Sequence, residues 1–236
     1  MLNFLTDPVD LYCERLGPGL TGEPFNLLSN LAFIVAAWLL RTELRHETGP
    51  AGDRLTVSTR KALAWYPPGV AMIGLGSGLF HAFANVWSKF ADVIPITLLI
   101  AWVLYYWHRR ILGSGPGELL VRVGALAALT GTGIAWGLSQ SWIGGSQNYL
   151  GVAAYLWYMA FEYRGRPGSA ALWLTAPGFL LALVFRSADH QLCGTIPVGS
   201  HFLWHLTMSG VCYGMGHALI RATGGVAQPS ATEGRP

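Results

Sequence analysis

Apolar stretches that approach the length of a membrane span recur along this chain and leave little sequence between them. They cover residues 26–40, 65–84, 90–107, 119–138, 149–161, 170–185 and 201–220. Gly, Pro or charged residues separate them, and a helix needs about 20 apolar residues to cross a hydrocarbon core of about 30 Å. The pattern therefore predicts an all-α fold: a polytopic membrane protein built as a bundle of seven transmembrane helices.

The composition agrees with this class. Of 236 residues, 52% are hydrophobic and 11% are charged, whereas a soluble domain carries about 25% charged residues. The net charge of +3 comes from basic residues scattered singly or in pairs, so nucleic acid is not expected as a partner. We expect one membrane domain over residues 1–221 and a disordered carboxyl-terminal tail over residues 222–236, which has no apolar pattern.

The basic residues predict an orientation, because cytoplasmic loops carry an excess of Lys and Arg. Alternate loops hold most of them, namely Arg41, Arg45, Arg54, Arg60 and Lys61, then Arg109 and Arg110, then Arg164 and Arg166. The loops between carry few, with Lys89 in one and Arg186 beside another. The amino terminus is then outside and the carboxyl terminus cytoplasmic.

This topology places four ionisable side chains at one membrane level. His81 ends the second helix, Asp92 lies early in the third, and His201 and His205 open the seventh. Residues four apart share a helix face, so two imidazoles can reach one ion. Three histidines with an open fourth position are typical of catalytic zinc. A histidine at a helix end can also simply bond a carbonyl, but ionisable residues within a membrane are functional by default.

Other histidines receive no chemical role; His46 and His108 are expected at the cytoplasmic interface, and His190 and His217 lie off the motif.

Two further residues have open roles. Asp92 could orient a ligand or act as the general base that takes a proton from water. Ser77 lies one turn before His81, within Gly74-Leu75-Gly76-Ser77-Gly78. Its hydroxyl could stabilise a developing oxyanion, or the small residues could only let helices approach closely.

Taken together, these motifs resemble the alkaline ceramidases, within a superfamily of seven-helix membrane hydrolases that also includes the progestin and adiponectin receptors. The resemblance covers nearly the whole chain and rests on Tyr12-Cys13-Glu14, on Glu23-Pro24-Phe25-Asn26-Leu27-Leu28-Ser29-Asn30, on Ser77-x3-His81 with Asp92, and on His201-x3-His205. It implies that His81, His201 and His205 bind Zn²⁺, that Asp92 activates the attacking water and that Ser77 stabilises the tetrahedral intermediate. The implied reaction converts ceramide and water to sphingosine and a fatty acid, with membrane lipid as the partner.

The resemblance also implies a Ca²⁺ site in the amino-terminal segment. Glu14 and Glu23 match it, whereas Leu11 replaces the aspartate before the aromatic-Cys-Glu run, with Asp10 one residue earlier, and Leu16 stands where an oxygen ligand is expected. The calcium prediction thus concerns Asp10, Glu14 and Glu23. Calcium prefers six to eight oxygen ligands.

The cysteines give a separate expectation. Cys13 and Cys193 both fall outside the membrane in this topology, so they could form a disulfide that ties the amino-terminal segment to the loop before the seventh helix, or remain two free thiols. Cys212 is expected to be a small buried apolar residue.

The sequence thus predicts a zinc-dependent lipid amidase. The alternative from another class is a receptor or lipid-binding protein that keeps the fold without turnover. A transporter is a third possibility, but inverted repeats and paired broken helices are absent from the sequence. The composition fits a multi-pass protein of a bacterial inner membrane, with the site toward the periplasmic side.

Overall fold

The structure, a computed structural model, describes residues 2–17, 19–46, 55, 57–135 and 146–224. Within these ranges the regular secondary structure is helical, and the β-type pairing is a single isolated bridge between Pro8 and Asn85. The all-α prediction is therefore confirmed. Residues 136–138, the predicted end of the fourth helix, and residues 225–236 of the predicted tail lie outside the described residues.

Among the described residues, seven long helices of 13 residues or more form the bundle. They are α3 (Leu31–His46), α5 (Tyr66–Phe83), α6 (Val86–Tyr106), α7 (Pro116–Ala135), α9 (Leu150–Glu162), α10 (Ser169–Leu192) and α11 (His201–Gly224). Short helical segments lie between them: α1 (Leu2–Leu5), α2 (Pro24–Ser29), α4 (Val57–Leu63), the π-helical η1 (Trp107–Ile111) and the 3₁₀ segment η2 (Ser146–Tyr149).

Several boundaries differ from the sequence-based expectation; α3, for example, runs to His46, six residues past the predicted end at 40. The first helix is divided into α2 and α3 at Asn30, where the side chains of Ser29 and Asn30 both donate to the Asn26 carbonyl, at 2.9 and 2.8 Å. Such bonds compete with the helical backbone. Helix α10 runs on to Leu192, seven residues past the predicted end at 185, and α11 runs to Gly224, three residues into the predicted tail.

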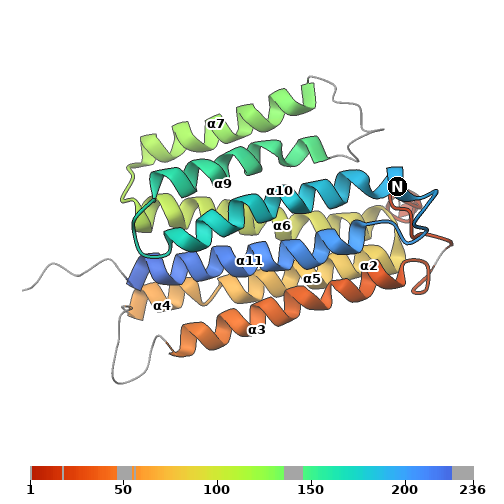
Figure 1. Cartoon of the computed structure of the whole chain (residues 1–236), viewed down its shortest axis with the longest axis horizontal. Coiled ribbons are helices and arrows are strands. Elements are labelled where there is room, and N and C mark those ends of the chain that lie inside the picture. Colours follow the sequence, from red (N-terminus) through yellow and green to blue (C-terminus); the bar gives the residue numbers. More distant parts are fainter. Residues whose placement is uncertain (1, 18, 47–54, 56, 136–145, 225–236) are drawn as a thin grey trace, which may run out of the picture.

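The long helices lie side by side with their axes roughly along one direction (Figure 1). Helices α10 and α11 pack together, as do α5 and α6, while α3 packs against both α5 and α11. Helix α7 stands at the margin, where it contacts α9, and α9 in turn contacts α10. This arrangement brings the ends of α5, α6, α10 and α11 to one end of the bundle.

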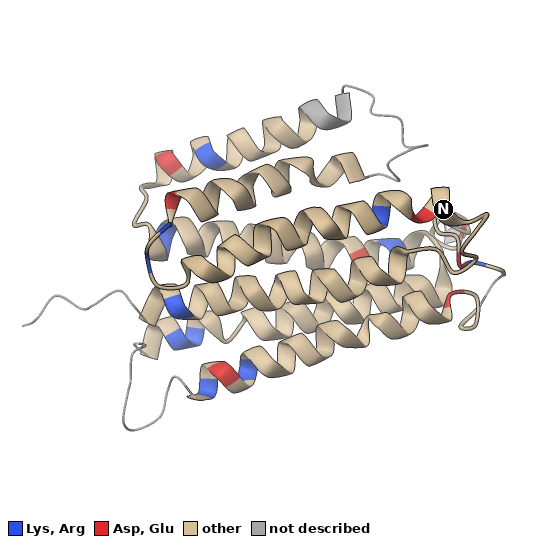
Figure 2. Cartoon of the chain, viewed as in Figure 1, with Lys and Arg blue, Asp and Glu red and all other residues tan. Residues whose placement is uncertain are grey.

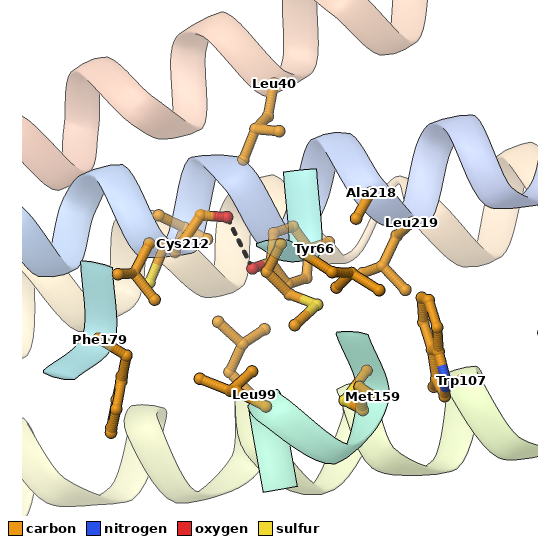
Figure 3. Close-up of a cluster of buried hydrophobic side chains, with 14 of the residues drawn as sticks. Leu40, Tyr66, Leu99, Trp107, Met159, Phe179, Cys212, Ala218 and Leu219 are labelled. Carbon is orange, nitrogen blue, oxygen red and sulfur yellow. Dashed lines mark hydrogen bonds between the residues drawn. The ribbon is translucent and has the colours of Figure 1, made fainter. Parts of the chain in front are cut away.

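The middle of the bundle is an apolar core to which most of these helices contribute. Leu40, Leu99, Met159, Phe179 and Leu219 are buried there, as shown in Figure 3. The same view shows Tyr66, whose hydroxyl donates to the Cys212 carbonyl at 2.9 Å. Cys212 itself is a buried free cysteine, as the sequence suggests.

The outer surface of the bundle is apolar and its charged residues gather mostly toward the two ends (Figure 2). Large hydrophobic side chains such as Trp38, Leu98, Leu174 and Val184 are exposed on it. By length and composition, three helical stretches can cross a membrane: Pro24–His46, Val86–Ile111 and Ser169–Leu192. Lipid, rather than water, suits such a surface, and these stretches indicate a membrane protein.

Candidate metal centre

Three histidines from two helices meet at one end of the bundle. His81 lies near the end of α5, and His201 and His205 lie one turn apart at the start of α11. One ring nitrogen from each lies within 4.8 Å of the others, and all three side chains are buried. The Nε2 atoms of His81 and His205 are 3.2 Å apart. This buried group can hold a metal ion.

The start of α11 is fixed by Asp189, near the end of α10. One carboxylate oxygen of Asp189 accepts the backbone N–H groups of Ser200 and His201, at 2.7 and 2.9 Å. These are amide groups that a helix start leaves without a partner. Gly199 precedes them with a φ of +62°, and a Cβ atom there would lie 2.1 Å from the Asp189 carboxylate. Glycine is therefore required where the chain enters α11, and this entry positions His201.

Hydrogen bonds set the tautomers of two of the histidines. The Ser29 hydroxyl donates to the Asn26 carbonyl, so in its 2.7 Å contact with His205 Nδ1 the imidazole is the donor. His81 Nδ1 lies 2.5 Å from the Glu23 carboxylate and donates to it. In both rings Nε2 is then an acceptor, and the two acceptors face each other across 3.2 Å. A cation between the two Nε2 atoms satisfies both. Histidines that bind a metal through one ring nitrogen usually donate a hydrogen bond from the other, as these two do.

His201 is held by stacking instead. The ring of Tyr12 lies parallel to it, with centroids 3.6 Å apart and 15° between the planes. Burial raises the pKa of Tyr12 to about 12, so its phenol is neutral at physiological pH. Within the part of the chain that the structure describes, His201 Nδ1 is buried and has no hydrogen-bond partner. The histidine group thus has ring nitrogens that the protein itself leaves unsatisfied.

Asp92 and Ser77 join this group because α5 and α6 approach closely. A Cβ atom on Gly76 would lie 2.1 Å from the Ala91 carbonyl oxygen, so a larger residue would push the helices apart. At this contact the Ser77 hydroxyl donates a hydrogen bond to the Asp92 carboxylate. Ser77 Oγ is also 3.4 Å from His205 Nε2. The structure therefore brings together all five residues expected to carry zinc chemistry.

A long cavity of about 130 Å³ runs from this group into the bundle. Its polar end is lined by Ser77, Asp92, Arg186, His201 and His205. The remainder is almost entirely apolar or aromatic and is formed by α5, α6, α9, α10 and α11. On α11 its lining extends from His201 to Met215, about 21 Å at 1.5 Å per residue. The cavity is thus polar at the histidines and apolar along the rest of its length.

Of the residues predicted to bind calcium, Glu14 and Glu23 lie near each other, and both bond to Asn26. Both oxygens of Glu14 accept backbone N–H groups at the start of α2, from Phe25 at 2.6 Å and Asn26 at 2.7 Å. Glu23 pairs with Arg15 and His81, and Asp10 is exposed. The metal-binding groups found among the described residues include none of these acids. The oxygens of Glu14 and Glu23 bond to a helix start, an arginine and a histidine, and calcium binding stays a prediction.

A disulfide joins Cys13 to Cys193, with Cα atoms 5.3 Å apart. It links the amino-terminal segment to the turn between α10 and α11. The backbone N–H of Cys13 also donates to the Asp189 carboxylate at 3.0 Å. These links hold Tyr12 against His201. His190 lies near the two sulfur atoms, but sulfur in a disulfide is not the thiolate that binds metals.

Several residues that support this site could not be assigned that role from the sequence. Tyr12, Glu23 and Ser29 lie within the motifs that carry the resemblance and Asp189 lies in none, but nothing in their spacing reveals that all four support the histidines. Arg186 is different, because a charged residue inside an apolar run is a functional signal. It is easily taken for a loop residue if the sixth helix ends at 185; the extension of α10 to Leu192 places it inside the helix instead.

Fold and site together define a helical membrane protein with a buried three-histidine centre at the polar end of an apolar cavity. Comparison with protein-family models, with curated proteins and with solved structures finds no match to this chain.

Proposed function

We propose that this protein is a zinc-dependent lipid amidase, which hydrolyses the N-acyl bond of ceramide or a related N-acyl lipid to an amine and a fatty acid. One observation carries the proposal: His81, His201 and His205 form a buried group that can hold a metal ion at the polar end of a long apolar cavity. An amphiphile with an amide between its head and its acyl chain matches that combination.

The ligand set supports zinc. Neutral imidazoles in threes, with a further position open to the cavity, suit catalytic zinc better than structural zinc, which more often uses thiolates. The hydrogen bonds from His81 to Glu23 and from His205 to Ser29 are the outer contacts that such ligands need. Zinc, when bound, supplies Lewis-acid catalysis for hydrolysis of a carbonyl compound.

The remaining chemistry is assigned to Asp92 and Ser77. Amide hydrolysis must move a proton from the attacking water to the departing nitrogen, and Asp92 is the carboxylate that lines the cavity at the histidines. We assign it the role of general base and, in the second step, of general acid. We assign Ser77, which lies 3.4 Å from His205 Nε2, to the developing oxyanion. Its one hydroxyl proton, donated to Asp92 at rest, would turn to the oxyanion once Asp92 has accepted the proton of the water.

The proposal includes a location. We propose seven membrane spans with the amino terminus outside and the site on the outer, periplasmic side of a bacterial inner membrane. The basic residues near the ends of α3, α9 and α11 support this orientation by the positive-inside rule. The Cys13–Cys193 disulfide lies at the opposite end, with the histidines, and disulfides persist in oxidising compartments.

The test is metal content of detergent-purified protein by mass spectrometry, together with hydrolysis of a fluorescent short-chain ceramide with and without a chelator. We expect one zinc per chain and release of fatty acid that the chelator abolishes. Zinc without hydrolysis of any N-acyl lipid would instead favour a receptor or lipid-binding protein that keeps the fold. Folded protein without zinc would overturn the proposal.

A further inference from the structure

The cavity holds a cation that the proposed hydrolysis does not use. Arg186 lines the polar end beside Ser77, Asp92 and His201. An arginine stays charged in proteins, and this one lies inside Ser169–Leu192, a helix able to cross a membrane. A charge at such a position is costly to keep and marks a functional site by default.

Aromatic rings, rather than a carboxylate, surround Arg186. Its guanidinium carbon lies 5.7 Å from the ring centroid of Tyr12, 5.6 Å from that of Tyr149 and 5.4 Å from that of Trp204. One of its N–H groups donates to the Tyr12 hydroxyl at 2.9 Å. Among the described residues it forms no ion pair, and its Nε–H is buried without a hydrogen-bond partner. The aromatic cage therefore holds the cation without neutralising it.

The cage places Arg186 close to the histidines. Tyr12 is stacked on His201 at 3.6 Å, and Trp204 directly precedes His205 in α11. Arg186 and His201 thus have Tyr12 as a common neighbour. A group bound by Arg186 would therefore lie near an amide at the histidines.

The charges at this end of the cavity favour an anion. Arg186 is the cation and Asp92 the carboxylate among the residues that line the cavity, so a single carboxylate faces both the guanidinium and the histidine group. Glu23, behind His81, is neutralised by Arg15. If the proposed function holds, the divalent charge of the metal is then left unbalanced in an apolar surrounding, where charges interact strongly.

We propose that Arg186 binds an anionic group of the substrate, and that the preferred substrate is an N-acyl lipid with a carboxylate next to its amide, such as a long-chain N-acyl amino acid. This inference rests on the proposed function and specifies its substrate class. In such a lipid one carbon separates the carboxylate from the amide nitrogen, whereas a ceramide offers neutral hydroxyls there. Arginine binds carboxylates through paired N–H donors.

The reaction remains a hydrolysis and needs no other reactant. Water adds to the acyl carbon, the carbon–nitrogen bond breaks, and the nitrogen leaves with a proton from the water. The products are a fatty acid and a free amino acid. Arg186 holds the carboxylate throughout and takes no part in the proton transfer, so it is a specificity-determining residue.

The experiment compares N-oleoylglycine with N-oleoylethanolamine, which carries a neutral hydroxyl in place of the carboxylate. For the zinc-loaded protein, we expect kcat/KM to be at least about tenfold higher for N-oleoylglycine, since hydrogen bonds to charged groups are worth that much. We expect the ratio to fall toward one in Arg186→Gln and to be partly kept in Arg186→Lys. The matched control is Lys89→Gln, which removes an exposed cation at the same end of the bundle and should keep the wild-type ratio.

Calorimetric binding of both lipids, with zinc content and thermal stability of each variant, separates the possible failures. Hydrolysis of the neutral lipid at an equal or higher rate would overturn the role of Arg186 and leave the amidase intact. Absence of hydrolysis with tighter binding of N-oleoylglycine that needs Arg186 would support the anion site and overturn the amidase. If Arg186→Gln only relieves inhibition by added oleate, the residue binds the product and the inference fails. If that variant does not fold, the wild-type comparison and Arg186→Lys decide.

Discussion

Two glutamate–histidine pairs lie at opposite ends of this bundle, and their closest nitrogen–oxygen distances are nearly the same. Glu23 and His81 are 2.5 Å apart and almost completely buried, whereas Glu43 and His217 are 2.6 Å apart with 18% and 36% of their side chains exposed. The second nitrogen of His81 faces His205 in the metal-binding group. His217 belongs to no such group among the described residues. The comparison teaches that a carboxylate–histidine pair indicates chemistry only when burial and further ligands accompany it.

The largest expected effect distinguishes His81 and His205 from His217. His81→Ala or His205→Ala should abolish zinc binding and lower hydrolysis by about three orders of magnitude or more, because several kcal/mol of transition-state stabilisation depend on the metal. Mass spectrometry and the ceramide assay measure both quantities. His217→Ala, in the same helix as His205, is the control and should keep zinc and activity. Stoichiometric zinc in His205→Ala would remove that residue from the ligand set.

The next largest effect is expected from substitution of Asp92, the carboxylate that lines the cavity. Asp92→Asn should keep zinc and lower kcat by about 10²- to 10⁴-fold, the range that general acid–base catalysis contributes. Single-turnover hydrolysis and metal content check this together. Asp10→Asn, at an exposed aspartate, should behave as wild type. Full activity in Asp92→Asn would exclude Asp92 as the base.

The two glutamates test the comparison directly. Glu23→Gln should weaken zinc binding by about 10- to 100-fold, since outer carboxylates orient metal-bound histidines by about that factor. Glu43→Gln should leave zinc affinity unchanged. Competition with a chromophoric chelator measures both variants, and equal affinities would show that the Glu23–His81 contact supports only the fold.

The smallest effect concerns stability at the exposed pair. His217→Gln should change the free energy of unfolding by less than about 1 kcal/mol, as is usual for partly exposed ion pairs. Thermal unfolding in detergent provides the measurement. A larger loss would mean that the Glu43–His217 pair stabilises the packing of α3 on α11 more than its exposure indicates.

Much of the site could be predicted because its strongest signals are local. His201 and His205 are four apart in an apolar run, which fixes them on one face of any helix. The apolar stretches, oriented by the basic loops, also placed His81 and Asp92 at nearly the same depth in the membrane. His108, in contrast, was expected at the interface because its neighbours in sequence are basic. It is wholly buried and contacts Tyr155, because α9 packs over it, which the sequence does not reveal.

What the sequence by itself determined was the helical class, the approximate limits of the long helices and the identity of the histidines that meet, because helix period and apolar length are properties of contiguous residues. The tertiary structure alone decided which residues support them. Ser29 reaches His205 across 176 residues and Glu23 reaches His81 across 58; Tyr12 covers His201, and Arg186 enters its aromatic cage because α10 continues past the expected end. Such contacts depend on how helices pack, and packing is set by the combined shape of many side chains rather than by any local pattern.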